Sequence, residues 1–515
     1  MFLKNVFIAG GIGTLIFFGG CQQSSVNSIN PIDDSSNDSE SFVLGEKLKN
    51  PYSVSPMKLA RDSLVERGVL AKSAITDQDL SATHYYICFK PETELKLFEL
   101  KKDSSLVLWD YPLDYEILEG GTVYRDPGIP EGKPNYQYTA VGVNQQLPFV
   151  EYEVLEELIL EPEPKDSIIA KKTVYGYYSL LEQEALRITD NLPENVPGLS
   201  KTMGKWRPTG NIQVYDDILG QNVPVVSVNV RTRNWFKWWN GYTDINGNFR
   251  CSKKYYGDLS YSLKWQYPKN RLDIRSGRIG QAFFNGPSQK RGAWNLVISS
   301  KMSWTYAHIF RAGAFYVGQQ TFGLKSKPFD LISIQAMDEN GPTNKSGHYR
   351  SWNENIRIWK NWYDGTRISS RDLFSITAHE LGHAHHDEIY NGAFGTVDSK
   401  IKEAWACAVS YYMTSSVYSL PLTSWLFGWY HMQTWKRGGN AYSPLMIDLV
   451  DSYNQRNLSS NYLQDRVSGY TLKQIETIIA KSKCKNITDF KNEIKALPLP
   501  TGITSTIRDE YLSQY

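Results

Sequence analysis

The chain has 515 residues, 41% of them hydrophobic and 21% charged, a composition typical of a globular protein and a length that exceeds one ordinary core. Its 56 basic and 54 acidic residues nearly balance, so the formal charge is +2. This balance excludes the strong basic field of a nucleic-acid-binding protein, and no nucleic-acid partner is expected.

The chain opens with a short apolar stretch. Lys4 precedes an apolar run over residues 6–18, and two glycines separate that run from Cys21. The run is too short to span a bilayer comfortably, and its charged start and small-residue end are typical of a secretory signal. An N-terminal anchor helix is the alternative.

The tripeptide Gly19-Gly20-Cys21 resembles the lipobox of bacterial lipoproteins. The resemblance implies cleavage before Cys21 and a lipid on that cysteine. We therefore expect a signal peptide over residues 1–20 and a flexible tether over residues 21–50, which is rich in Ser, Asn and Asp. The expected location is the cell envelope, with the protein lipid-anchored to a bacterial membrane, most simply the outer membrane.

The first folded segment, residues 80–165, predicts a small α+β domain. The stretches "HYYICFKP" and "LVLWDYPLDYEI" have the composition of strands. Between them, "ETELKLFEL" predicts a short helix with Leu95, Phe98 and Leu100 facing inward.

Residues 209–300 predict a β-sandwich, because several short β-rich runs alternate with Gly and Pro turns. A Val-rich strand, then Gly-x-x-Val-Pro-Val, then Thr243-Asp244-x-x-Gly247-x-Phe249, resembles the carboxypeptidase regulatory-like domain. The resemblance implies an accessory module of an exported bacterial protein.

Two features of this segment allow two interpretations each. Asp244, Asn246 and Asn248 alternate as calcium ligands do, but the same residue types form ordinary hairpin turns, and we expect the turn. The three tryptophans of "NWFKWWNGY" could stack on a sugar or a partner, but packing against a neighbouring domain is favoured.

The remaining segment, residues 301–515, predicts a mainly helical α+β domain. The stretch "SWTYAHIFRAGAFYVG" has a helical pattern, and "DLISIQAM" and "ENIRIWKNW" have strand patterns with Ile356 and Ile358 on one side. From Ser369 onward the patterns are mainly helical. The fold class expected for the whole chain is multidomain, with small α+β, β-sandwich and mainly helical α+β parts in that order.

The stretch "TAHELGHAHHDE", residues 377–388, holds four of the chain's 8 histidines. His379 and His383 have the HExxH spacing, and on a helix they share one face about 6 Å apart along the axis, so both imidazoles can bind one ion. Glu380 can reach a water at that ion without ligating it, which suits a general base. Ser369 with Asp372 predicts the helix cap. A solvated, His-rich helix end is the alternative.

A catalytic zinc needs a third protein ligand and an open position for water. His386 lies seven residues after His379, so an unbroken helix places it roughly 10 Å farther along the axis, too far to share the ion. His385 points away from the metal face. Both are predicted to be groups outside the ligand set or on the surface.

A second helix is predicted in "KEAWACAVSYYM", with Glu403 on the side opposite its apolar face. HExxH followed about 20 residues later by Glu on the next helix resembles the gluzincin, or thermolysin-like, zinc metallopeptidases. The resemblance implies Zn²⁺ held by His379, His383 and Glu403, with Glu380 as catalytic base. Cys407 occupies the position where the family often has an acid, so the histidines need another orienting group, such as Glu388 or a backbone carbonyl.

The resemblance implies two further parts of the site. The family supplies a Tyr or His from its C-terminal part to stabilise the oxyanion, and the candidates are His431, Tyr442 and Tyr430. Its substrate pairs with an edge strand just before the HExxH helix, a position that residues 355–359 occupy here. An interior strand is the alternative.

These predictions define a lipid-anchored, exported zinc metallopeptidase that hydrolyses peptide bonds of a protein or peptide substrate, with a zincin-like C-terminal domain. Two alternatives stay open. One is a surface-binding lipoprotein with a structural or vestigial zinc site, and the other is a zinc amidase that acts on cell-wall material.

Overall fold

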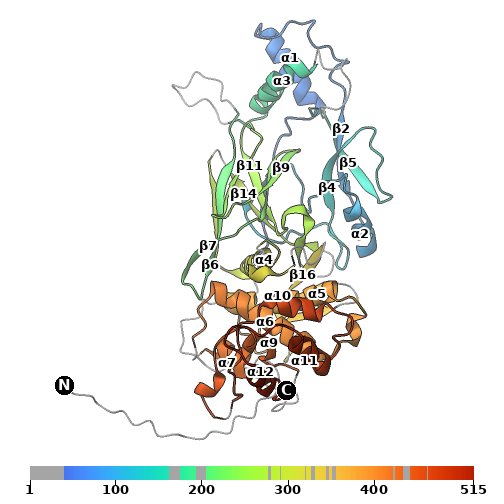
Figure 1. The fold of residues 1–515 in the computed structure, drawn as a ribbon. Coiled ribbons are helices and arrows are strands. Elements are labelled where there is room, and N and C mark those ends of the chain that lie inside the picture. Colours follow the sequence, from blue (N-terminus) through green and yellow to red (C-terminus); the bar gives the residue numbers. More distant parts are fainter. Residues whose placement is uncertain are drawn as a thin grey trace, which may run out of the picture. The chain divides into compact units, whose positions relative to one another are not determined.

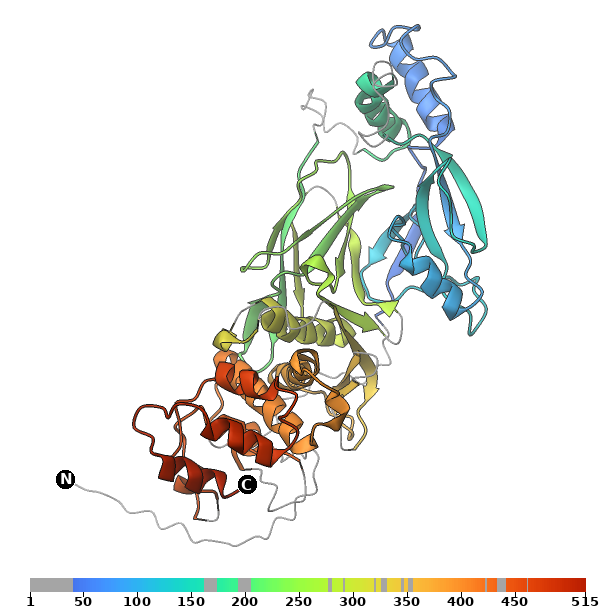
Figure 2. The ribbon, with the colours of Figure 1, turned by 45° about the vertical axis from the view of Figure 1, so that its right-hand side comes forward.

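The computed structural model describes most of the chain as a mixed α+β protein with several antiparallel sheets (Figures 1 and 2). The described residues are 40–161, 174–192, 205–276, 280–289, 292–318, 321–325, 331–343, 347–350, 355–421, 424–432, 441–460 and 462–515. The predicted signal peptide, Cys21 and most of the predicted tether lie outside these residues. In the described part, no helix has the length and apolar character needed to cross a membrane.

The described chain divides into two compact units, where the sequence predicts three folded domains. The N-terminal unit holds residues 40–315 and 331–336, and the C-terminal unit holds residues 316–325 and 337–515. The chain passes from the first unit to the second within helix α4 (Lys301–Gly318) and again within strand β16 (Ile332–Asn340).

The first part of the N-terminal unit combines three helices with two small sheets. Helix α1 (Val54–Glu66) packs against α3 (Val174–Ile188), and the two run side by side in both views (Figures 1 and 2). The antiparallel strand order is β4-β2-β5 in one sheet and β1-β3 in the other. The remaining elements are β1 (Val43–Lys47), β2 (His84–Phe89), α2 (Glu94–Lys102), β3 (Tyr115–Glu119), β4 (Gln137–Gly142) and β5 (Tyr152–Leu158).

The second part of the N-terminal unit is built from two four-stranded sheets. One has the order β10-β6-β15 with β7 on β6, and the other has the order β14-β11-β8-β9. Aromatic rings from both sheets meet, with Tyr261 stacked on Trp294 at 5.0 Å and Phe249 within 6.3 Å of both rings. The strands of these two sheets are β6 (Thr209–Asp216), β7 (Gln221–Pro224), β8 (Asn229–Asn234), β9 (Lys237–Tyr242), β10 (Asn248–Arg250), β11 (Leu259–Lys264), β14 (Phe283–Gln289) and β15 (Trp294–Ile298). Two further strands, β12 (Leu272–Ser276) and β13 (Gly280–Gln281), belong to another sheet, in which β12 pairs with β13 and with β16.

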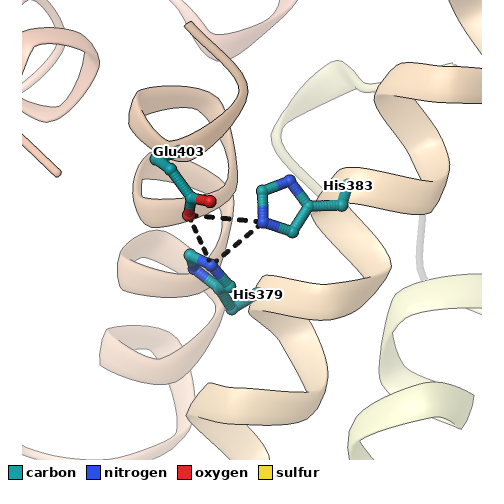
Figure 3. Close-up of side chains that lie close together, drawn as sticks. All are labelled: His379, His383 and Glu403. Carbon is teal, nitrogen blue, oxygen red and sulfur yellow. Dashed lines mark hydrogen bonds and ion pairs between the residues drawn. The ribbon is translucent and has the colours of Figure 1, made fainter. Parts of the chain in front are cut away.

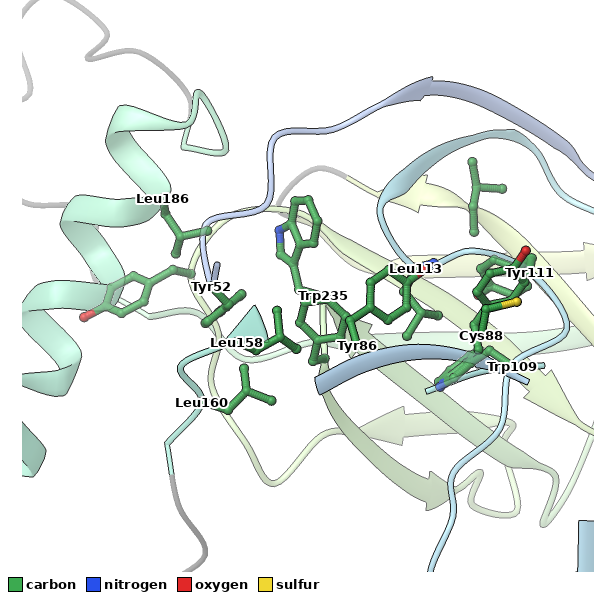
Figure 4. Packing of buried hydrophobic residues seen from close by; sticks show 14 of the residues in the cluster. Tyr52, Tyr86, Cys88, Trp109, Tyr111, Leu113, Leu158, Leu160, Leu186 and Trp235 are labelled. Carbon is green, nitrogen blue, oxygen red and sulfur yellow. Dashed lines mark hydrogen bonds between the residues drawn. The ribbon is translucent and has the colours of Figure 1, made fainter. Parts of the chain in front are cut away.

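One aromatic core joins these two parts (Figure 4). Trp235 and Phe236 follow β8 and are buried against Tyr52 and Tyr86 of the first part, with the Tyr86 and Phe236 rings 5.0 Å apart. For Trp235 the favoured interpretation, packing against a neighbouring part of the chain, is confirmed, whereas Trp238 is 38% exposed and does not fit it. Because this core spans both segments, they form one unit.

The C-terminal unit is mainly helical. Its helices are α5 (Ser370–Ile389), α6 (Ser399–Val417), α7 (Trp425–Met432), α9 (Leu445–Asp448), α10 (Leu472–Ile479), α11 (Ile487–Lys495) and α12 (Ser505–Leu512). Strand β17 (Gly347–Arg350) pairs antiparallel with β18 (Asn355–Asn361), and the end of β16 lies on the other side of β18.

Three local predictions need correction. Residues 40–50 are not tether, because Phe42 is buried against Tyr111 and β1 pairs with β3. In α2 the inward residues are Leu97 and Leu100. The predicted Leu95 and Phe98 are exposed, because the buried face of the helix begins at Leu97, two residues after Leu95. The strand at 355–359 is interior, and β17 is the edge strand.

One further local prediction is confirmed, and the state of the described cysteines is clear. Asp244 Oδ1 accepts hydrogen bonds from the backbone N–H groups of Asn246 and Asn248, at 2.9 and 2.8 Å, so the expected hairpin turn is confirmed. The four cysteines among the described residues, Cys88, Cys251, Cys407 and Cys484, are buried free thiols.

Candidate metal centre

Helix α5 carries the HExxH residues on an unbroken run. Its N-cap is Ser369, whose side chain accepts a hydrogen bond from the Asp372 backbone N–H at 3.2 Å, as the sequence predicts. Leu373, Ala378 and Leu381 are fully buried, so the helix is fixed by its apolar face. His379 and His383 therefore project from a rigid support, one turn apart.

Helix α6 presents Glu403 to the same place. Asp398 caps this helix by accepting a hydrogen bond from the Lys400 backbone N–H at 2.9 Å. Gly382 lets the two helices approach closely, because a Cβ at that position would lie 3.1 Å from the Ala406 Cα. The Trp405 indole also donates a hydrogen bond to the Gly382 carbonyl at 3.0 Å. The close approach brings Glu403, one turn earlier on α6, opposite the histidines.

The three predicted ligands point at one another (Figure 3). Glu403 Oε2 lies 3.1 Å from His379 Nε2 and 3.4 Å from His383 Nε2, and the two imidazole nitrogens are 3.2 Å apart. The side chains are mostly but not fully buried, with 10%, 12% and 21% of their surfaces exposed for His379, His383 and Glu403. The three side chains are thus assembled, and each keeps a small exposed surface.

The electrostatics of the group favour an ionised carboxylate. Burial acts to raise the pKa of the Glu403 carboxyl, but the His383 and His379 imidazoles outweigh burial and hold that pKa well below its usual range. A charged, acceptor-only carboxylate beside two imidazole nitrogens is the donor set of a transition-metal site.

The separations in this group fit zinc. Ligand atoms in a tetrahedral site with bonds of 2.0–2.1 Å are roughly 3.3 Å apart, and the three separations here are 3.1, 3.2 and 3.4 Å. Two nitrogens and one oxygen leave the fourth tetrahedral position for water or substrate, the arrangement that catalytic zinc requires. His379, His383 and Glu403 are therefore the residues that would hold the ion.

The side chain of Glu380, on α5, lies against the edge strand β17. Its residue is 7% exposed, and a Cβ on Gly347 would come within 2.7 Å of Glu380 Oε1 and within 2.6 Å of Ile376 Cγ2. Tyr349, two residues along β17, donates a hydrogen bond to Asp387 Oδ2 at 2.7 Å. The edge strand thus lies directly over the proposed base, and only glycine at position 347 leaves room for the carboxylate.

His385 and His386 are outside the ligand group, as predicted, but neither is on the surface. His385 Nδ1 lies 2.8 Å from the Tyr316 hydroxyl and its Nε2 lies 2.9 Å from Glu476 Oε1 on α10. His386 packs against the Phe394 ring at 5.0 Å, and burial lowers the pKa of His386 to about 3. Both are fully buried because α10 and the segment after α5 cover this face of the helix.

No hydrogen bond from the described part of the chain orients the outer nitrogen of His379. Within the described residues, His379 Nδ1 is buried and no group, neither Glu388 nor a backbone carbonyl, bonds it. Ring packing holds the imidazole instead, since the Trp429 and Tyr442 rings lie 5.9 and 6.1 Å from it. The sequence analysis did not identify Trp429 as a neighbour of the ligands; it named the adjacent Tyr430 as a candidate instead.

The three candidates for oxyanion stabilisation lie in different environments. Tyr442 lies beside His379 and is half-buried, so it stays a candidate. Tyr430 is buried, with its hydroxyl bonded to Ser375 and Ser410. His431 is 2% exposed among the rings of Phe427, Tyr411 and Tyr453, and burial lowers the pKa of His431 to about 4. Because the His431 side chain is packed in the helical core, it is poorly placed to contact a substrate oxyanion.

A second group of metal-ligand types also occurs in the described part of the C-terminal unit. Asp448, Asp451 and Asp465 bring carboxylate oxygens within 4.8 Å of one another. Burial raises the pKa of Asp451 to about 7 and also raises those of Asp448 and Asp465. The raised pKa values favour protonated carboxyls in this group.

The comparisons with known proteins add little to this geometry. No protein-family model matches the sequence, and no curated protein matches it. A solved structure to which the chain is similar is a 9R-lipoxygenase from Cyanothece PCC8801, at 15% sequence identity and a TM-score of 0.12. The similarity covers 23% of this chain and 20% of the lipoxygenase chain, an overlap that gives no information on fold or function.

Proposed function

We propose that the protein is a zinc metallopeptidase of gluzincin type that hydrolyses peptide bonds in a protein or peptide substrate. The observation that carries the proposal is the separation of 3.1–3.4 Å among His379 Nε2, His383 Nε2 and Glu403 Oε2. Helices α5 and α6 pack closely at Gly382 and Ala406 and so hold these three atoms at a spacing that suits zinc ligands.

The chain's own residues suit the hydrolysis. His379, His383 and Glu403 would hold zinc, which would supply Lewis acidity to polarise a carbonyl and acidify a water molecule. Glu380, one residue after the first ligand, accepts the proton of the attacking water and transfers it to the leaving amine. Tyr442, whose ring lies 6.1 Å from that of His379, is the candidate donor of a hydrogen bond to the developing oxyanion.

The edge strand supports a peptide substrate over other amides. An extended peptide can add to β17 by main-chain hydrogen bonds, because β17 is the last strand of its sheet in the described part of the chain. Gly347 on this strand lies against Glu380, so a peptide paired there would run past the base.

The finer layout belongs to the same proposal. A zincin-like domain occupies the C-terminal unit, and residues 209–300 are a carboxypeptidase regulatory-like β-sandwich. A signal peptide over 1–20 and a lipid on Cys21 place the protein in the cell envelope, anchored to a bacterial membrane, preferentially the outer membrane.

Metal content is the first test. The purified full chain should bind one zinc per molecule, and Glu403→Ala should weaken that binding by at least about tenfold. His386→Leu is the matched control, since it removes a neighbouring imidazole from α5 and should leave the stoichiometry unchanged. Loss of zinc in His386→Leu alone would refute the ligand assignment.

Turnover separates the remaining alternatives. Glu380→Gln should keep one zinc and lower kcat on a peptide library by about a hundredfold or more. A surface-binding lipoprotein with structural zinc would be indifferent to Glu380→Gln in every assay. A zinc amidase would cleave cell-wall fragments but no peptide in the library.

A further inference from the structure

A second site candidate lies in the N-terminal unit, on one face of the sheet β14-β11-β8-β9. The whole of β8 is buried, yet its sequence is Asn-Val-Arg-Thr-Arg-Asn. Because side chains alternate along a strand, Asn229, Arg231 and Arg233 share one face. A buried sheet face is normally apolar, so three polar residues here require an explanation.

The strand register extends this polar face across the sheet. On β9, Asn240 lies opposite Arg231 and Trp238 lies opposite Arg233. On β11, Lys264 lies opposite Asn229 and Ser262 lies opposite Arg231. On β14, Asn285 lies opposite Ser262, in line with Arg231. Arg, Lys, Asn and Trp side chains from four strands therefore converge on one side.

This face forms the wall of a cavity of about 550 Å³, a size usual for small-molecule sites. The opposite wall comes from α2 and the chain around Trp109 and Tyr124. The Arg231 guanidinium lies over the Trp109 ring at 3.6 Å, which fixes its direction. The cavity is thus bounded by two segments of one unit.

Several polar atoms of residues in this wall have no hydrogen-bond partner in the part of the chain that the structure describes. Among the described residues, no group hydrogen-bonds Arg231 Nη2, Asn285 Nδ2 or Asn229 Oδ1, although all three atoms are buried. The three residues are 7%, 2% and 2% exposed. A buried donor or acceptor without a partner is unfavourable, so these three side chains would gain from a polar ligand toward which they turn in the cavity.

The charge of the cavity wall is positive. Five cationic and two acidic side chains line it, and one of the acids, Asp273, is engaged by Arg275 at 3.2 Å. Burial, with Arg231 nearby, lowers the pKa of Lys264 to about 8, against a smaller opposing effect of Asp273. Burial and a neighbouring cation disfavour the charged form of Lys264, and a bound anion would stabilise that charged form.

We propose that this cavity binds an acidic monosaccharide, with Arg231 and Lys264 on its carboxylate. The amide groups of Asn229, Asn240 and Asn285 offer both donors and acceptors, which suit ring hydroxyls that both donate and accept. The Trp238 side chain, 38% exposed, offers an aromatic surface for the sugar ring. The site is independent of the metal centre.

Calorimetry with the full chain tests the proposal, with galacturonate as probe and galactose as its neutral counterpart. Galacturonate should bind one to one, and at least about tenfold more tightly than galactose. Lys264→Met should weaken galacturonate binding by about tenfold or more and leave galactose binding nearly unchanged. The control is Lys254→Met, an exposed lysine outside the cavity, which should bind like the wild type.

Three results would overturn the inference. One is the absence of binding of galacturonate and of glucuronate up to about 10 mM, which corresponds to a free energy too weak for a built site. Another is equal affinity in the Lys264→Met and Lys254→Met variants. The third is acetate binding as tightly as galacturonate, since that would mean recognition of an anion without its hydroxyls. Asn240→Ala, in the exposed part of the wall, covers the case in which Lys264→Met fails to fold, and it should weaken both sugars.

Discussion

At the scale of single residues, the metal centre depends on two glycines as much as on its ligands. Gly382 sits within HExxH and faces Ala406, while Gly347 sits on the edge strand and faces Glu380. Neither has a backbone dihedral that demands glycine, so the requirement is space. A side chain at either position would press on a different part of the site.

Gly347→Ala should lower peptidase activity while sparing the metal. The new Cβ would lie 2.7 Å from Glu380 Oε1 and 2.8 Å from its Cγ, so the carboxylate must move. Displacement of a catalytic group by about 1 Å costs up to about a hundredfold in rate. We expect kcat/KM to fall by about 10- to 100-fold, with zinc content unchanged.

The matched control for that variant is Gly395→Ala, since a Cβ at Gly395 meets no atom within 4 Å. It should leave activity and zinc content as in the wild type. Wild-type kcat/KM in Gly347→Ala would mean that Glu380 is not held against β17 as the structure has it.

At the scale of elements, the pairing of α5 with α6 makes the site, and it was only partly predictable. The period and cap of α5, and the apolar face of α6, are local patterns, so both helices follow from the sequence. The contact between Gly382 and Ala406 is not local, and no pattern within α6 fixes which of its faces meets α5. Glu403 therefore rested on resemblance until the packing was known.

Gly382→Leu tests that packing. On an isolated helix, replacing glycine by leucine stabilises by somewhat under 1 kcal/mol, because glycine is a poor helix former. Here the side chain would push against Ala406, whose Cα lies 3.1 Å from the position of the new Cβ. We expect a lower melting temperature and zinc affinity reduced by at least about tenfold, because Glu403 moves away with α6. A variant that melts higher and binds zinc normally would show that the helices can separate without cost to the site.

At the scale of the whole molecule, non-local aromatic packing decided the division of the chain. The segments 80–165 and 209–300 each carry their own strand patterns, which predict separate domains. Their joining depends on Trp235 and Phe236, whose partners Tyr52 and Tyr86 are about 150 or more residues away in sequence. Sequence periodicity reports which face of an element is apolar, but it does not report which other element covers that face.

Buried carboxyls in the C-terminal unit should make global stability depend on pH. Gln455 and Tyr511 hydrogen-bond Asp448, but Asp451 Oδ2 and Asp465 Oδ2 are buried without a donor among the described residues. Burial raises the pKa of Asp451 to about 7, above the value of about 3.9 in the unfolded chain. Between these values the folded state binds more protons, so the free energy of unfolding falls as pH rises from about 4 to about 7.

Asp465→Asn should remove part of this pH dependence, because the amide is neutral at every pH and no longer repels Asp451. We expect the variant to be more stable than the wild type by about 1–2 kcal/mol at pH 8 and nearly equal to it at pH 5, by urea denaturation of the full chain. Glu339→Gln, which removes an exposed acid of the same unit, should show the wild-type slope. A less stable Asp465→Asn at pH 8 would contradict the prediction, because it would mean that a bound cation, rather than protons, neutralises the three carboxylates.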